Sequence, residues 1–294
     1  MSEACGQNIP QRERNKHHYI PVFYLKEWAG KDGRLCEFSR PYNTPSGQLK
    51  PNIKSIPVKP RRVYPDGTGF IKHLYRFPGL NPRLANYLES EFFLRVDNEA
   101  AVVMQSFLRG KVQFDQKSTS AWVRFLMSMF HRNRKSIMRI AAMVDLDYVK
   151  NLEEEIRPQY EAQREKHGEG PTWDEMIESF TDADFQKIRL MTLRKSMLSE
   201  RVGEFLNSMI WTVAPRYSKY PMFTSDRPIT MTALDQDNAH LVTPLTPNHN
   251  FFAAKNAETM HRLEHRNRSG GLAGIINNNI VRQARTYVYA IDDS

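Results

Sequence analysis

The chain has 294 residues, of which 40% are hydrophobic and 26% charged, a balance typical of folded globular proteins and not of disordered ones. The longest apolar run covers only a few residues, far short of the roughly 20 needed to cross a bilayer. Residues 1–16 are polar and basic, unlike a signal segment. We therefore expect a soluble, cytoplasmic protein with no membrane partner. Cys5 and Cys36 are too few for a disulfide scaffold or a cysteine-built zinc site, so both are predicted to be free thiols.

The charge balance is basic. Lysine and arginine number 42 against 33 aspartates and glutamates, which gives a net charge of +9 at pH 7. Such a surplus favours a polyanionic partner, of which nucleic acid is the commonest. Solubility alone could account for the same surplus, so charge leaves both interpretations open, and it says nothing about protein partners.

The N-terminal third is predicted to be extended. Residues 1–15 are expected to form a flexible leader ahead of a single α+β domain over residues 16–294. A short strand or turn at His17 should lead into one helical turn that ends by Gly30, and the alternation in residues 34–38 predicts a strand. Repeated prolines across residues 40–70 exclude long helices and predict a segment that wraps a core.

Residues 80–208 are predicted to be helical. Proline in a first turn and apolar residues at four-residue spacing predict one helix over residues 81–109. A second is expected from about residue 118 through residue 140. Residues 148–170 are highly charged and weakly amphipathic, which predicts an exposed helical arm. Two more helices are predicted over residues 173–180 and 183–207.

Residues 209–291 are predicted to be rich in strands. Short strands are expected at residues 210–213, 222–225, 229–231, 250–254 and 286–290, with a helix over residues 271–285. Pro244 and Pro247 indicate a rigid loop of architectural value only. This order predicts an α+β fold, with central long helices, a C-terminal mixed or antiparallel β-sheet and an N-terminal strand packed on it.

Two adjacent histidines, His17 and His18, precede a stretch with an apolar, proline-punctuated pattern. Imidazole titrates near neutral pH, so one ring could act as a general acid or base or as a metal ligand while the other orients it. Adjacent side chains of an extended backbone point to opposite faces, so only one ring would reach a given pocket. In the structural alternative, the ring nitrogens bond to backbone and hold the N-terminal segment in place.

Ser225 and Asp226 end a predicted strand just before an Arg-Pro pair, which presents a hydroxyl and a carboxylate at a rigid turn. Asp226 could accept a hydrogen bond from an imidazole or hold a metal ion, and Ser225 could contact a phosphate or a carbonyl. Alternatively, both side chains cap their own backbone. No nucleophile-elbow signature supports a serine triad.

Charged residues accompany the apolar faces of the two long helices. Glu89 precedes Phe92 and Phe93 by three and four positions, so its carboxylate is either a functional acid near the apolar face or part of a solvated face. The second helix carries a basic stripe of Arg124, His131, Arg132 and Arg134. That stripe could hold a phosphate backbone or pair with Glu89 or Glu91 in a buried network.

Asn277 lies in a run of three asparagines within a predicted helix, where asparagine is a poor helix former, so it should kink the helix or face a polar pocket. His261 and His265 have ligand spacing but no acidic third ligand beyond Glu258 and Glu264, which makes them a weak metal site. The metal ligands therefore stay undefined, with a divalent metal as one cofactor that the site could use. Nucleotide-binding glycine loops and cysteine zinc patterns are absent from the sequence.

The runs HHYIP at residues 17–21 and FTSDRP at residues 223–228 resemble a mostly bacterial family, domain of unknown function 4238. Weaker segments of the same resemblance are residues 88–91, 99–101, 130–134, 244–247, 277–279 and 285–289, so it covers about residues 15–290. The resemblance implies a single domain and groups the polar residues into one set. That set is His17, His18, Glu89, Arg132, Ser225, Asp226 and Asn277.

Two hypotheses of function follow. In the first, the set forms an enzyme pocket for metal-assisted hydrolysis of RNA or DNA phosphodiesters. In that pocket His17 or His18 is the acid or base, Asp226 orients it or holds the ion, and Arg132 neutralises phosphate. In the second, the protein is a non-catalytic module that binds nucleic acid or protein, in a phage-defence or mobile-element setting. An apolar pocket would instead favour a small-molecule scaffold.

Overall fold

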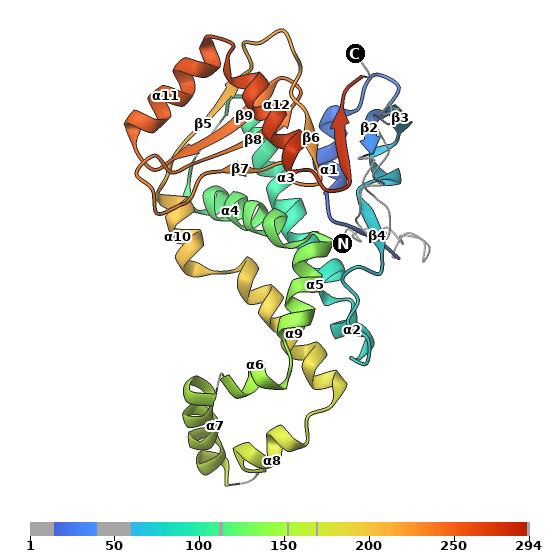
Figure 1. Ribbon diagram of the computed structural model, residues 1–294, viewed down its shortest axis with the longest axis vertical. Coiled ribbons are helices and arrows are strands. Elements are labelled where there is room, and N and C mark those ends of the chain that lie inside the picture. The colour runs from blue at the N-terminus through green and yellow to red at the C-terminus, as the bar shows by residue number, and fades with distance from the viewer. Residues whose placement is uncertain (1–14, 40–59, 112–113, 152, 169, 293–294) are drawn as a thin grey trace, which may run out of the picture.

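The computed structural model describes residues 15–39, 60–111, 114–151, 153–168 and 170–292 (Figure 1). Within them helices and antiparallel sheets are combined, so the predicted α+β class is confirmed. The predicted leader, except for residue 15, lies outside the described residues, as do Cys5 and residues 40–59 of the proline-rich segment. Cys36 is buried and is a free thiol. In the part of the chain that the structure describes, every helix is too short or too polar to cross a membrane.

The N- and C-terminal segments of the chain meet in one four-stranded antiparallel sheet. Its order is β3 (Pro60–Val63), β2 (Leu35–Ser39), β10 (Tyr287–Ala290) and β6 (Thr224–Ser225). A second antiparallel sheet has the order β5 (Ile210–Pro215), β9 (His249–Ala254), β8 (His240–Thr246) and β7 (Thr230–Met231). A two-stranded sheet pairs β1 (Lys16–His18) with β4 (Phe70–Lys72). Because β6 and β7 are edge strands, residues 226–229 carry the chain from the edge of one sheet to the edge of the other.

Strand β8 contains a segment that the sequence predicts to be a loop. Pro244 pairs with Asn250 on β9, and the register shifts between Pro244 and Thr246. Proline has no N–H to donate to a ladder, so it is tolerated in a strand mainly at an edge or an irregularity such as this one. The loop prediction is therefore wrong, because an irregular strand accommodates Pro244.

The helices between the sheets are more broken than predicted. Their bounds are α1 (Val22–Leu25), α2 (Pro82–Ala85), α3 (Leu94–Leu108), α4 (Gln116–His131), α5 (Arg134–Met143), α6 (Leu146–Asn151), α7 (Glu153–His167), α8 (Trp173–Glu178), α9 (Asp182–Met197), α10 (Glu200–Ser208), α11 (Ala257–Arg268) and α12 (Leu272–Gln283). The predicted helix over residues 81–109 passes through a π-helical turn, Leu88–Phe93. The second long helix ends at His131 and restarts at Arg134, because the Asn133 side chain accepts a hydrogen bond from the Ser136 N–H and caps α5.

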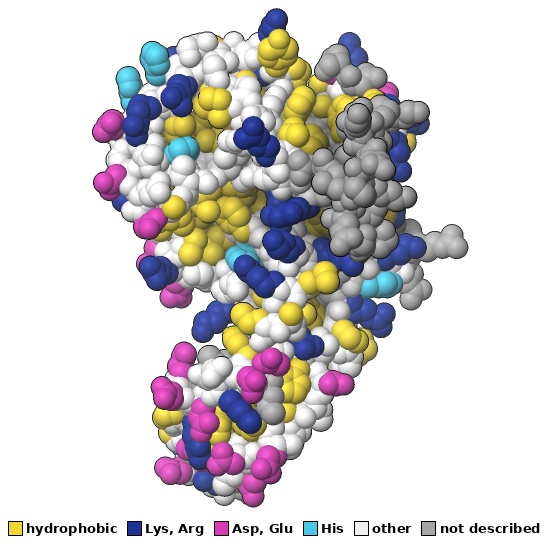
Figure 2. All heavy atoms as spheres, viewed as in Figure 1, with side chains coloured by type: hydrophobic (Ala, Val, Ile, Leu, Met, Phe, Trp, Pro, Cys, Tyr) yellow, Lys and Arg dark blue, Asp and Glu magenta, His cyan; other side chains and the backbone are white. Residues whose placement is uncertain are grey.

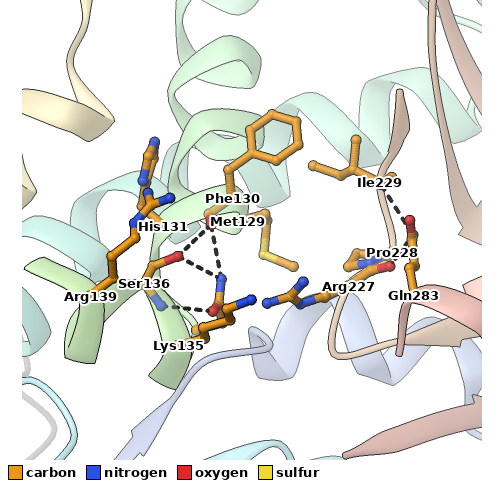
Figure 3. Close-up of a pocket in the computed structure, with 11 residues that line it drawn as sticks. Met129, Phe130, His131, Lys135, Ser136, Arg139, Arg227, Pro228, Ile229 and Gln283 are labelled. Carbon is orange, nitrogen blue, oxygen red and sulfur yellow. Dashed lines mark hydrogen bonds between the residues drawn. The ribbon is translucent and has the colours of Figure 1, made fainter. Parts of the chain in front are cut away.

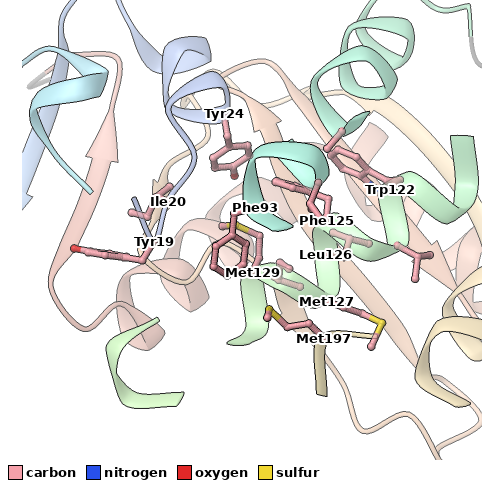
Figure 4. Packing of buried hydrophobic residues seen from close by; sticks show 14 of the residues in the cluster. Tyr19, Ile20, Tyr24, Phe93, Trp122, Phe125, Leu126, Met127, Met129 and Met197 are labelled. Atoms are coloured by element: carbon pink, nitrogen blue, oxygen red, sulfur yellow. The ribbon is translucent and has the colours of Figure 1, made fainter. Parts of the chain in front are cut away.

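The main core lies between the helices α3 and α4 and the second sheet. The Phe251 ring on β9 lies 5.8 Å from Phe107 of α3 and 5.6 Å from Trp122 of α4. The same cluster reaches Tyr19 and Tyr24 near the N-terminus (Figure 4). Phe252, the next residue on β9, points the other way, into a smaller cluster beneath α11 and α12. Alternation along β9 thus buries both faces of this sheet.

Helices α6, α7 and α8 lie apart from the rest, below the body in Figure 1. They join it through α5 and α9, which pack against each other. No residue of α7 is buried, so this helix contributes nothing to the core.

Candidate anion-binding cleft

Two adjoining hollows lie where the chain crosses between the two large sheets. The larger, about 580 Å³, extends from Tyr19 and Phe70 to the segment just before β10. The smaller, about 380 Å³, lies between the end of α4, the start of α5 and residues 227–229. Asn133, Lys135 and Arg227 line both, so we call the two together the basic cleft.

Five cationic side chains line the basic cleft. They are Arg134, Lys135, Arg139, Arg227 and Arg285. None of them forms an ion pair with a carboxylate in the described part of the chain. Asp226 is the one acidic side chain among the described residues of the lining. Figure 2 shows basic side chains gathered in the middle of the face it draws.

Two elements from distant parts of the chain bring these charges together. Asn133 starts α5 at the cleft, so Arg134 and Lys135 lie in its first turn, where the unpaired backbone N–H groups add to the positive potential. Arg227 follows strand β6, and Figure 3 shows its guanidinium and the Lys135 ammonium pointing toward one another. Burial lowers the pKa of Arg227, and the nearby charge of Arg285 lowers it further. The cleft thus holds like charges that repel one another.

Ser225 and Asp226 hold the backbone around Arg227. The carboxylate of Asp226 accepts hydrogen bonds from the Arg285 N–H at 2.8 Å and the Thr286 N–H at 3.0 Å. The hydroxyl of Ser225, which is fully buried, accepts from the Arg227 N–H at 3.0 Å. Burial raises the pKa of Asp226. Ser225 therefore caps its own turn, whereas Asp226 anchors the approach to β10 and also lines the cleft.

His17 and His18 lie beside the cleft, on strand β1. The Nδ1 atom of His17 accepts a hydrogen bond from the Tyr75 N–H at 2.9 Å, and the two rings stack with centroids 5.5 Å apart. The His18 ring lies against Phe70 instead, as expected for neighbours on extended backbone. Burial lowers the pKa of His18. The next residue, Tyr19, lines the larger hollow.

Arg132 is fully buried and does not line the cleft. Its guanidinium donates to the two carboxylate oxygens of Asp97 at 2.8 and 3.2 Å and to the Ser128 hydroxyl at 2.8 Å. It also lies over the Phe93 ring, 4.4 Å from the centroid. The Tyr75 hydroxyl donates to the carbonyl of Arg132 at 2.7 Å, which ties this network to His17. The residue after Arg132 is Asn133, so the network holds a wall of the cleft.

Glu89 belongs to the same buried network. It lies in the π-helical turn, accepts a hydrogen bond from the His18 backbone N–H and is within electrostatic range of Arg132 and Asp97. Burial raises its pKa to about 7. We call His17, Tyr75, Glu89, Asp97 and Arg132 the buried histidine network.

Arg124 and Asn277 lie elsewhere. Arg124 forms an ion pair with Glu99 of α3 at 2.8 Å. The side-chain carbonyl of Asn277 accepts from the Phe223 N–H, and its amide donates to the Pro221 carbonyl, each at 2.9 Å. Neither residue is part of the cleft lining. Two members of the basic stripe therefore pair with carboxylates of α3, Arg124 with Glu99 and Arg132 with Asp97, instead of with Glu89 or Glu91. The other two, His131 and Arg134, line the cleft.

Sequence reasoning assigned no site role to Lys135, Arg139, Arg227, Arg285 or Tyr19. Asn133 was a usable signal, because asparagine is one of the residues preferred at the position just before a helix, where its side chain accepts from a backbone N–H of the first turn. Arg285 and Arg227 gave no such signal, since they are 58 positions apart in sequence. Metal ligands stay undefined, because the described residues contain no group of three or more His, Cys, Asp or Glu side chains close enough to share an ion.

Comparison with known proteins agrees with the sequence motifs. The family model described as Protein of unknown function (DUF4238) matches residues 16–294, and the chain therefore belongs to that family. No curated protein and no solved structure matches the chain.

The ion pair of Arg132 leads to a first prediction about stability. Asp97→Asn leaves the buried guanidinium without a counter-charge and should lower the free energy of unfolding by about 2–4 kcal/mol. Glu99→Gln, two positions along the same helix, removes two partly exposed pairs, with Arg95 and Arg124, and should cost less than about 1 kcal/mol. Urea denaturation of both variants measures the difference. An equal decrease in the free energy of unfolding in both variants would show that the buried pair stabilises the fold no more than the exposed pairs do.

Glu89 leads to a prediction about pH. Its pKa in the folded state, about 7, exceeds the usual 4.5, so the folded protein binds the proton more tightly than the unfolded chain does. The contribution of Glu89 to stability is therefore greatest below pH 4.5 and is lost as the pH rises to about 7. Glu89→Gln has no such proton and should not show this loss. Its free energy of unfolding relative to wild type should therefore rise by on the order of 1–3 kcal/mol as the pH is raised from 4.5 to about 7.

The matched control is Glu91→Gln, which alters an exposed ion pair with Arg83 in the same segment. Its stability relative to wild type should not rise over the same pH interval. Denaturation curves at several pH values give both differences, and a Glu89→Gln difference that stays constant with pH would contradict the assignment.

Proposed function

We propose that this member of the DUF4238 family binds single-stranded nucleic acid by seating its phosphates in the basic cleft. One observation carries the proposal: among the described residues, five cations without an ion pair to a carboxylate line the same two hollows, beside a single carboxylate. Clustered like charges repel one another, and the repulsion is strongest where burial reduces the screening by water, as at Arg227. Phosphate groups would supply the missing counter-charge.

Aromatic side chains favour a single strand over a duplex. Phe70 and Tyr287, both partly exposed, line the larger hollow beside Arg134 and Arg285, with the buried Tyr19 behind them. Unpaired bases stack on aromatic rings whatever their sequence, whereas the bases of a duplex are already stacked. A groove that combines cations with aromatic rings is the usual solution for binding single strands without sequence preference.

The buried histidine network supports this proposal by positioning. Through Tyr75 it joins β1, which leads to Tyr19, to the end of α4, which leads to Asn133. Asp226 plays the same part for Arg285 and Thr286 on the opposite wall. In this proposal, the HHYIP and FTSDRP motifs hold the walls of the cleft at the separation that a strand requires.

Hydrolysis of the bound strand is a second candidate, which one observation favours: Asp226 lies in the same lining as the cations. Its carboxylate would hold a divalent ion or orient a base. His17 or His18, next to Tyr19, would supply the acid or base, and Ser225 and Glu89 would support them. The non-catalytic alternative needs the cations alone and fits a nucleic-acid-binding role in phage defence or mobile elements.

Binding is tested with a fluorescent single-stranded oligonucleotide of about 12 nucleotides. Lys135→Met with Arg227→Met removes two cations and should weaken affinity at least about tenfold at 0.1 M salt, and lower the salt slope by about 1.4. Lys117→Met, at the opposite end of α4, should leave both unchanged. Circular dichroism melting checks that all variants fold. Equal affinity of the double variant and wild type would rule out the cleft as the binding surface.

Hydrolysis is tested by incubating wild type with labelled single-stranded RNA and DNA, with and without Mg²⁺ or Mn²⁺. If the second candidate holds, wild type cleaves the strand and Asp226→Asn, His17→Ala or His18→Ala abolishes cleavage while the melting temperature stays near that of wild type. Binding without cleavage in every condition leaves the non-catalytic role. Variants that simply melt earlier, with cleavage lost in proportion, would make these residues structural.

A further inference from the structure

Charge is segregated between two parts of the chain. Residues 145–181, which we call the acidic arm, contain eleven aspartates and glutamates and four lysines and arginines, a net charge of −7. The remainder of the chain carries +16. Figure 2 shows the acidic side chains concentrated on the arm and the basic ones on the body above it.

The arm presents uncompensated carboxylates to solvent. Its two arginines are already paired, Arg157 with Glu153 and Asp174, and Arg164 with Glu161. Exposed carboxylates without an ion pair among the described residues include Glu154, Glu155, Glu165 and Glu178. Since α7 has no buried residue and only Tyr148 of the arm packs against the main core, packing of the fold does not explain the carboxylates on this surface.

The carboxylates of α7 lie in a row. Glu154, Glu161 and Glu165 are separated by seven and four positions, which places them on one face of the helix at intervals of about 6 to 10 Å. Arg164 neutralises Glu161, but Glu154 and Glu165 keep this face of the helix negative and offer the cleft a substitute for the phosphates of a strand.

The arm cannot reach the cleft of its own chain. Helix α5 begins at the cleft with Arg134 and ends at Met143, where the arm starts, so its ten residues hold the two about 15 Å apart. Helix α9 packs along α5 and stiffens this connection. A contact between the two surfaces therefore requires two molecules.

We propose that the acidic arm of one copy docks in the basic cleft of a second copy and occupies the place of nucleic acid. The competition, though not the self-association, rests on the function proposed above. The contact is heterologous, since different surfaces meet, so each pair leaves one arm and one cleft free to add further copies. Attraction between exposed charges weakens with salt, so assembly should too.

The test separates the two surfaces by charge reversal. Lys135→Glu with Arg227→Glu disables the cleft, and Glu154→Lys with Glu155→Lys disables the arm. By sedimentation velocity in about 50 mM salt, wild type should form assemblies larger than a dimer that revert to monomer in about 500 mM salt. Each double variant alone should be monomeric. Glu258→Lys, an exposed carboxylate on α11, should associate as wild type does.

The decisive sample mixes the two double variants. The cleft variant keeps a functional arm and the arm variant keeps a functional cleft, so the mixture should form a one-to-one dimer that cannot grow. A mixture that stays monomeric, or a wild type that is monomeric at low salt, overturns the inference. Melting curves confirm that each variant is folded.

Oligonucleotide binding keeps this inference distinct from the proposed function. If the arm variant binds the oligonucleotide and wild type does not associate, the self-association is wrong and the proposed function stands. If copies associate but wild type does not bind the oligonucleotide, the proposed function is wrong and the self-association stands. If wild type both self-associates and binds the oligonucleotide, added oligonucleotide should dissociate the wild-type assemblies.

Discussion

The basic cleft depends on one buried ion pair. The side chain of Arg132 is fully buried, so its charge has to be compensated within the protein, and Asp97 of α3 supplies the carboxylate. Arg132 lies at the end of α4, and the pair fixes the point where the chain turns and α5 begins. Through the Tyr75 hydroxyl on its carbonyl, the same residue also fixes β1. The buried charge of Arg132 thus fixes the position of the start of α5, from which Arg134 and Lys135 reach the cleft.

The buried ionisable groups around Arg132 are either paired with an opposite charge or have a shifted pKa. Arg132 has a carboxylate, a hydroxyl and an aromatic face around it. Glu89, half-buried near the same guanidinium and a second carboxylate, retains its proton to higher pH. Two groups of charges have no ion pair among the described residues: the cations of the cleft and several carboxylates of the arm. Both proposals about partners follow from this separation.

Much of the fold could be predicted because its signals are local. The strands β2, β5, β9 and β10 and the helix α12 show clear periodicity and were predicted close to their observed bounds. Strand β8 was missed because Pro244 argues against a strand, and only pairing with β9 at a register shift overrides that local signal. The break between α4 and α5 was not predicted, because the apolar periodicity continues through it. The N-cap residue Asn133 is the local signal that indicates it.

The sequence by itself determined the α+β class, the family, the basic surplus, the charged arm and the two motifs that surround the cleft. Only the tertiary structure decided what each polar residue does. Asn277 and Ser225 bond to backbone, Arg132 is buried with Asp97, and Arg227 and Arg285 meet at the start of α5. The reason is physical: a charged side chain that is paired with neighbouring groups stabilises the fold, whereas one without such a partner can bind a ligand. Here those partners come from segments up to tens of residues apart, beyond the reach of any periodicity.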